Sequence, residues 1–185
     1  MVKGKRWTGV FRWVILLVLA LTYSFGGICP GQRDLRGATL HLKKKQVPPP
    51  SPMALRVIEL VNKERTKIKG CRPLRMEPSL NSAALEHSRD MARFHSVSHT
   101  GTDGSRPGDR MTRAGYNWSE AAENVAAGFT SPESVVNGWM KSPGHRANIL
   151  NCRFHDTGVG HDYLAIEAES GDYAHYWTMV FGIPK

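Results

Sequence analysis

Serine followed by proline occurs three times in this chain, at residues 51–52, 131–132 and 142–143. This pair is typical of a helix N-cap followed by proline at the first helical position. Apolar residues then step by three or four along 55–61 and 135–139, so helices are predicted from Pro52 toward Gly70 and from Pro132 onward. The third pair predicts a short helical turn that ends near Leu150. Two further helices are expected over 78–94 and 107–114.

The pattern changes after Thr157. Residues 158–165 and 173–181 are rich in aromatic and β-branched side chains, and the turn residues Glu169-Ser-Gly171 lie between them. Two strands joined as a hairpin are therefore predicted. Because helices come first and an antiparallel hairpin comes last, the order indicates an α+β fold and not a series of βαβ units.

Positive charge is concentrated before the predicted fold. The formal net charge of +9 divides into +4 for residues 1–29, +4 for 30–52 and +1 for 53–185, where 16 bases face 15 acids. The folded part therefore offers no electrostatic case for binding nucleic acid.

Residues 1–29 have the pattern of a signal peptide, with a basic start, the apolar run 14–21 and small residues near Ser24 and Gly26. An uncleaved signal anchor is the alternative, although 13–28 is short for a membrane span. Residues 30–52 are predicted to be a basic, proline-rich linker, and 53–185 the folded domain. The domain is expected outside the cytoplasm, secreted or tethered to the cell surface. Membrane contact is expected only through an uncleaved N-terminal segment or the basic linker.

Three cysteines in an exported chain allow one disulfide with one cysteine left over. Since Cys29 lies at the signal boundary, Cys71 and Cys152 are the natural pair. A zinc site built on two such distant cysteines is the less favoured alternative.

Chemistry-capable side chains are mostly histidines. Seven of the eight histidines follow residue 80, and the chain contains no HExxH, Walker, GxSxG or CxxC motif. His87 falls on the apolar stripe of the second helix and is expected to pack there. The histidines at 155, 161 and 175 lie on or near the hairpin, where partial burial explains them.

Six ordered motifs resemble the bacterial branch of the SCP-domain family, in the CAP superfamily of cysteine-rich secretory proteins, venom allergens and plant pathogenesis-related proteins. They cover about residues 53–183 and are Ser-His-Thr-Gly at 98–101, Ala-Gly-Tyr at 114–116, Ala-Glu-Asn-Val-Ala at 122–126, the run from Trp139 to Leu150, Gly-Val-Gly at 158–160 and Tyr-Trp-Thr-Met-Val-Phe-Gly at 176–182. The resemblance implies a single α-β-α sandwich with a central antiparallel sheet. It also implies a cleft in which two histidines meet acidic residues.

Matching the motifs residue by residue makes His99 and His145 the cleft histidines and Glu123 the first cleft glutamate. A second glutamate, three residues after the tryptophan in eukaryotic members, is Ser142 here. His99, His145 and Glu123 could hold Zn²⁺ or another divalent metal, or Glu123 could orient one imidazole from outside the metal shell. Glu123 and His145 are also the candidate catalytic pair.

These observations lead to two alternative functions. The expected one is an extracellular SCP-domain protein whose cleft binds a divalent metal or a small extracellular ligand, lipid included, without turnover; its partner would be that ligand or a cell-surface component. The alternative is a metal-assisted hydrolase that cleaves peptide or cell-wall bonds with the Glu–His pair. A hydrogen-bonded polar cluster without turnover is the purely structural interpretation of the same residues.

Overall fold

The computed structural model describes residues 48–164 and 174–185. The predicted signal segment, most of the predicted linker and the predicted hairpin turn lie outside these ranges. The described elements are α1 (Pro52–Thr66), β1 (Arg75–Met76), α2 (Pro78–Arg93), α3 (Pro107–Arg113), β2 (Trp118–Ala127), α4 (Pro132–Lys141), α5 (Pro143–Leu150), β3 (Asp156–Tyr163) and β4 (His175–Pro184). Five helices and a sheet confirm the α+β prediction.

The four described strands form one sheet in the order β1-β3-β4-β2. The three long strands are antiparallel, with Val159 opposite Met179 in the β3–β4 pair and Glu123 opposite Val180 in the β2–β4 pair. The two-residue strand β1 runs parallel to β3, with Arg75 opposite Asp156. The sheet is therefore mixed, and the predicted antiparallel pairing holds for its long strands.

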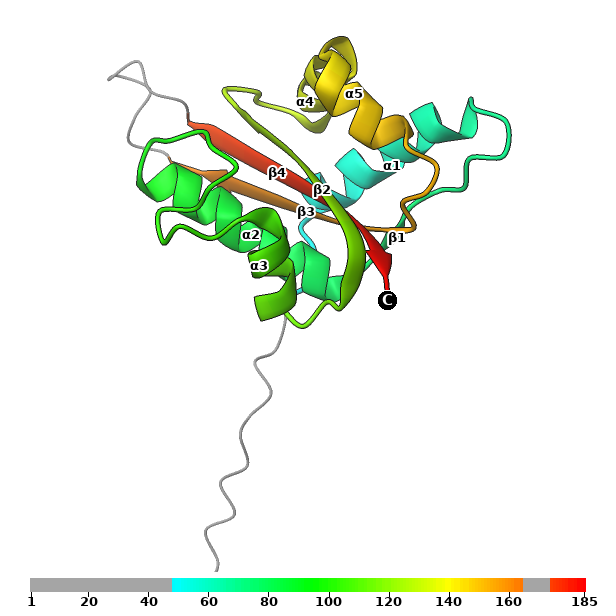
Figure 1. Ribbon diagram of the computed structural model, residues 1–185. Helices are drawn as coiled ribbons and strands as arrows, with labels where there is room; N and C mark the ends of the chain where they lie inside the picture. The colour runs from blue at the N-terminus through cyan, green and yellow to red at the C-terminus, as the bar shows by residue number, and fades with distance from the viewer. Residues whose placement is uncertain (1–47, 165–173) are drawn as a thin grey trace, which may run out of the picture. The chain divides into compact units, whose positions relative to one another are not determined.

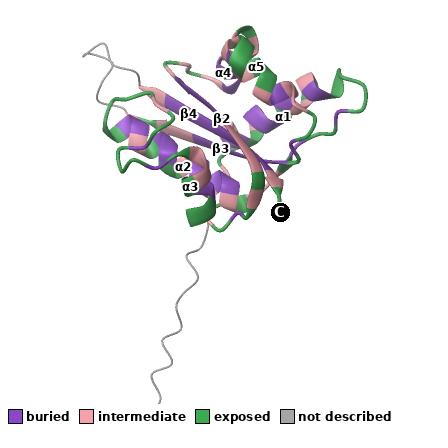
Figure 2. Cartoon of the chain, viewed as in Figure 1, coloured by how far each residue is buried: buried purple, intermediate pink, exposed green. Residues whose placement is uncertain are grey.

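Helices cover both faces of the sheet, as the sandwich prediction requires. In Figure 1, α2 and α3 lie on one side of the strands and α1, α4 and α5 on the other. The side chains of β4 alternate between these layers: Trp177 and Met179 pack with α1, α4 and α5, whereas Val180 packs with α2 and α3. Figure 2 shows the result, with buried residues along β3 and β4 and exposed residues on the outer sides of the helices.

Two of the three serine–proline signals act as predicted. The Oγ of Ser51 accepts a hydrogen bond from the Ala54 amide at 3.1 Å, and the Oγ of Ser131 accepts one from the Ser134 amide at 3.2 Å. The third serine, Ser142, makes no side-chain cap, yet a helix forms behind it from Pro143 to Leu150, where the short helical segment was predicted.

Strand β2 is the main element that was not predicted. Its sequence, WSEAAENVAA, is rich in alanine and glutamate and has weak strand propensity. It is a strand because it pairs with β4 along nearly its whole length, from Trp118 to Ala127. Tertiary pairing thus overrides local preference here.

The Gly-Val-Gly motif at 158–160 brings α2 into contact with β3. A Cβ on Gly158 would lie 2.1 Å from the backbone of Leu80 and Asn81, and one on Gly160 would lie 2.3 Å from the backbone of Ala84. These distances are far below van der Waals contact, so the close approach of helix and strand depends on both glycines.

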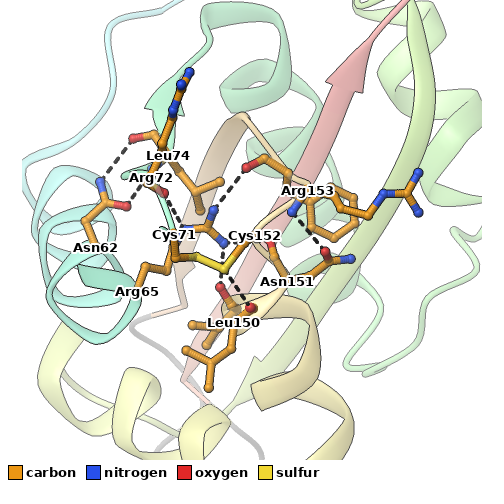
Figure 3. The surroundings of a disulfide bond; sticks show 11 residues. Asn62, Arg65, Cys71, Arg72, Leu74, Leu150, Asn151, Cys152 and Arg153 are labelled. Atoms are coloured by element: carbon orange, nitrogen blue, oxygen red, sulfur yellow. Dashed lines mark hydrogen bonds between the residues drawn. A yellow bond between two sulfur atoms is a disulfide. The ribbon is translucent and has the colours of Figure 1, made fainter. Parts of the chain in front are cut away.

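The predicted disulfide between Cys71 and Cys152 is confirmed. Figure 3 shows Arg65 of α1 beside it, with the guanidinium among backbone carbonyl groups. Arg65 is fully buried and donates hydrogen bonds of 2.7–3.0 Å to the carbonyl oxygens of Arg72, Ile149, Asn151 and Phe154. The disulfide and Arg65 together connect the end of α1 to the segment that follows α5.

Candidate functional site

Three different elements contribute the predicted site residues. His99 lies in the loop between α2 and α3, Glu123 in strand β2, and His145 in the first turn of α5. The Nδ1 of His99 is 2.9 Å from the Oε1 of Glu123. The side chain of His99 is 55% exposed, whereas that of Glu123 is 1% exposed. The carboxylate is thus at the bottom of the site and the imidazole at its surface.

Arg110 of α3 is a site residue that the sequence interpretation missed. Its Nη2 donates to the Oε2 of Glu123 at 2.7 Å and to the backbone oxygen of His99 at 3.1 Å. The arginine side chain is 3% exposed, so the ion pair is buried. A buried carboxylate needs a compensating positive charge nearby. Once Glu123 is assigned to a buried position, this requirement points to a neighbouring arginine or lysine.

His87 fixes the loop that carries His99. Its Nε2 donates to the backbone oxygen of Ser98 at 2.7 Å and lies 3.8 Å from the Oε1 of Glu123. Burial lowers the pKa of His87, so the ring is neutral at pH 7. The expectation that His87 packs inside the domain is confirmed, because it is 1% exposed.

Two asparagines attach α5, and with it His145, to strand β2. The Nδ2 of Asn124 donates to the backbone oxygen of His145 at 3.1 Å. The Nδ2 of Asn148 donates to the Oδ1 of Asn124 at 2.9 Å and to the backbone oxygen of Glu123 at 3.3 Å. The hydrogen-bond partners of Asn124 are thus both in helix α5.

The two cleft histidines have pKa values shifted in opposite directions. The hydrogen bond to Glu123 raises the pKa of His99. Burial, followed by the positive charge of His99, lowers the pKa of His145. The site therefore combines a ring that holds a proton readily with a ring that stays neutral.

The carboxylate of Glu123 is fully engaged by neighbouring side chains. Both carboxylate oxygens of Glu123 are engaged, Oε1 by His99 and Oε2 by Arg110. Within the described ranges, no three or more His, Cys, Asp or Glu side chains are arranged to hold a metal ion. The contact between Glu123 and His99 is of the kind by which a carboxylate orients an imidazole, one of the two roles considered for Glu123.

The fold and this cluster of side chains define a class of protein. The family model for the cysteine-rich secretory protein family, CAP, matches residues 58–181. The chain belongs to this family, as the six sequence motifs indicated.

Relatives and solved structures agree with the assignment. The chain is 39% identical over 126 residues to YkwD of Bacillus subtilis, a match that covers 68% of this chain and 45% of YkwD. A crystal structure of an extracellular protein containing an SCP domain from Bacillus anthracis superposes with a TM-score of 0.60 at 27% identity, over 73% of this chain and 44% of that one. An outer surface protein from Borrelia burgdorferi has the same fold, with a TM-score of 0.61 at 20% identity over 70% and 90% of the two chains.

The chain spans less than half the length of YkwD, and the relatives' names assign no activity to the shared part. None of the described helices has an apolar stretch long enough to cross a membrane.

Proposed function

We propose that this chain is a secreted or surface-tethered CAP-domain protein whose cleft binds a small extracellular ligand through His99 and His145 and does not hydrolyse it. Family membership supports the class, and the similar structures from B. anthracis and B. burgdorferi are described as an extracellular and an outer surface protein. The signal-like segment 1–29 is consistent with export.

The state of Glu123 is the observation that carries the proposal. A general base needs an accessible oxygen that gains a proton during the reaction. Glu123 is 1% exposed, and both of its oxygens are already engaged, Oε2 by the buried guanidinium of Arg110 at 2.7 Å and Oε1 by His99 at 2.9 Å. Ser142 stands in the place of the second glutamate, so the family's other candidate base is missing from this sequence.

The two imidazoles can recognise a ligand in complementary ways. The exposed His99 ring has its Nδ1 on Glu123, so its Nε2 is directed to other partners. Because the pKa of His99 is raised and that of His145 lowered, the His99 ring takes up a proton more readily and is the better donor, whereas the His145 ring more readily offers a neutral nitrogen as acceptor. Metal binding stays a prediction that depends on these two rings alone.

The test measures hydrolysis and binding separately. Purified peptidoglycan and a fluorescent casein should be cleaved no faster by the native chain than by a His99→Ala/His145→Ala double variant. Calorimetric Zn²⁺ titration tests the metal: a cleft site must be lost in each single His→Ala variant and retained in His155→Ala, whose histidine is exposed before β3. Hydrolysis that disappears in Glu123→Gln would overturn the proposal and restore the hydrolase alternative.

A further inference from the structure

A concave site lies beside the His99–Glu123 cluster. A cavity of about 380 Å³ opens between the exposed side of α2, the loop 101–105 and α3. His87 and Arg110 form part of its lining, and both also contact the His99–Glu123 cluster. His87 and Arg110 therefore belong both to the lining of the cavity and to the surroundings of Glu123.

The acidic residues of the cavity already have partners. Asp90 accepts hydrogen bonds from the backbone nitrogen and the hydroxyl of Thr102, at 2.9 and 2.6 Å. Asp103 is 2.9 Å from Arg113, which also approaches Glu86 at 3.4 Å. These contacts hold the loop against α2 and engage the negative charges of the wall.

Two arginines that line the cavity, Arg89 and Arg93, differ from Arg113 in having no ion pair with any described side chain. Arg89 and Arg93 are exposed, lie one turn apart on α2, and have no acidic partner among the residues that the structure describes. Like charges at this spacing destabilise a helix, and a bound anion between them would relieve the repulsion. The guanidinium of Arg93 lies 5.4 Å from the ring centroid of Phe94, which is 51% exposed and offers an apolar surface at the same opening.

The buried wall has two polar atoms without partners in the described part of the chain, the Nε of Arg110 and the Nδ1 of His87. The Nε of Arg110 is a donor. Because the Nε2 of His87 donates to a carbonyl oxygen, its Nδ1 has a lone pair and is an acceptor. Buried polar atoms of this kind are normally satisfied, and a hydroxyl group can accept from a donor such as Nε or donate to an acceptor such as Nδ1.

We propose that this cavity binds a small organic anion that has a hydroxyl group, with Arg89 and Arg93 binding the anionic group, the hydroxyl on the side of Arg110 and His87, and the carbon skeleton against Phe94. Carboxylates and phosphate monoesters share this chemistry, because both accept charge-assisted hydrogen bonds from guanidinium groups. Anion binding in this cavity does not require His99 or His145, so it does not depend on the function proposed for those two histidines.

The experiment uses two anions and their uncharged counterparts as probes: 4-hydroxybenzoate against phenol, and glucose 6-phosphate against glucose. Calorimetry or ligand-observed NMR with the full chain should show that at least one anion binds about tenfold or more tightly than its uncharged counterpart. The Arg89→Gln/Arg93→Gln double variant should lose about tenfold or more in affinity. Arg72→Gln, at an exposed arginine beside the disulfide, is the matched control and should bind as the native chain does.

The two anions distinguish a carboxylate ligand from a phosphate ligand. Both substituted arginines are exposed, so circular dichroism should show an intact fold in the double variant. The proposal is overturned if neither anion binds more tightly than its uncharged counterpart, or if the double variant binds as well as Arg72→Gln. Retained binding in the His99→Ala/His145→Ala variant separates this site from the cleft, whereas loss of binding in that variant would place the anion in the cleft and overturn the assignment.

Discussion

At the scale of single residues, Glu123 and Arg110 form a buried ion pair in which each side chain compensates the charge of the other. We expect Arg110→Met to lower the free energy of unfolding by about 3–5 kcal/mol, because it leaves a buried carboxylate without its counter-charge. Combining it with Glu123→Gln, which removes that charge, should recover a substantial part of the loss. Urea unfolding of the single and double variants measures both effects.

Arg113→Gln is the control for this cycle. Arg113 also lies on α3 and also forms ion pairs, but its side chain is 49% exposed, and exposed pairs contribute about 0–1 kcal/mol. Equal losses for Arg110→Met and Arg113→Gln would contradict the importance assigned to burial.

His161 provides a prediction about pH. Burial, followed by the charge of His175, lowers its pKa from an ordinary 6.5 to about 4. Between these values the unfolded chain binds the proton more tightly than the folded chain does, so stability falls as pH decreases below 6.5. From pH 7 to pH 5 we expect a loss of about 2 kcal/mol from this residue, measured by urea unfolding in the presence of EDTA.

His161→Phe keeps a ring against Trp177 and removes the titrating group. This variant should lose less stability on acidification than the native chain. His99 acts in the opposite direction, because its raised pKa stabilises the folded chain at pH values below that pKa. The effect of His161 is therefore isolated by comparing His161→Phe with the native chain at each pH, since both contain His99. An unchanged pH dependence in His161→Phe would refute the assignment.

Some of the site could be predicted from the sequence and some could not. His99, Glu123 and His145 were found because they lie within family motifs. Arg110 shares the short helix α3 with Arg113, and Arg106 directly precedes this helix. Local sequence gives no sign of which of the three arginines is buried. Its role depends on the position of β2, which the sequence interpretation had not assigned as a strand.

At the scale of the elements, helices were predicted better than strands because their signals are local. Serine–proline pairs mark α1 and α4 within a few residues of their first turns. Strand β2 consists of residues that favour helices as much as strands, and the residues of β4 with which it pairs lie 49 to 66 positions further along the sequence. Only the assembled sheet identifies it.

The close contact between α2 and β3 predicts that adding one methyl group, at Gly158, destabilises the domain. Gly158→Ala should destabilise the domain by about 3 kcal/mol or more, because the new Cβ would overlap the backbone of α2 and neither element can move without disturbing the core. Thermal or urea unfolding measures the loss.

Gly144→Ala in α5 is the matched control. No atom lies within 4 Å of a Cβ built there, and alanine favours the helix by up to about 1 kcal/mol over glycine. A Gly158→Ala variant as stable as Gly144→Ala would show that the helix and strand are further apart than described.

At the scale of the whole molecule, the disulfide should contribute strongly to stability. It joins residues 81 positions apart, which corresponds to about 4.5 kcal/mol in the chain-entropy treatment. We expect the Cys71→Ala/Cys152→Ala variant to lose several kcal/mol in urea unfolding, and non-reducing mass spectrometry of the native chain to show the two cysteines linked. Two free thiols in the native protein would contradict this prediction.

The disulfide also has a consequence for proteolysis. Every residue from 71 to 152 lies within one covalent ring, and this ring includes His99, Glu123 and His145. A protease that cuts the chain once inside the ring opens it without releasing a fragment, so both new ends stay attached to the same molecule. The nicked protein would migrate as a single species on a non-reducing gel and separate into two only after reduction.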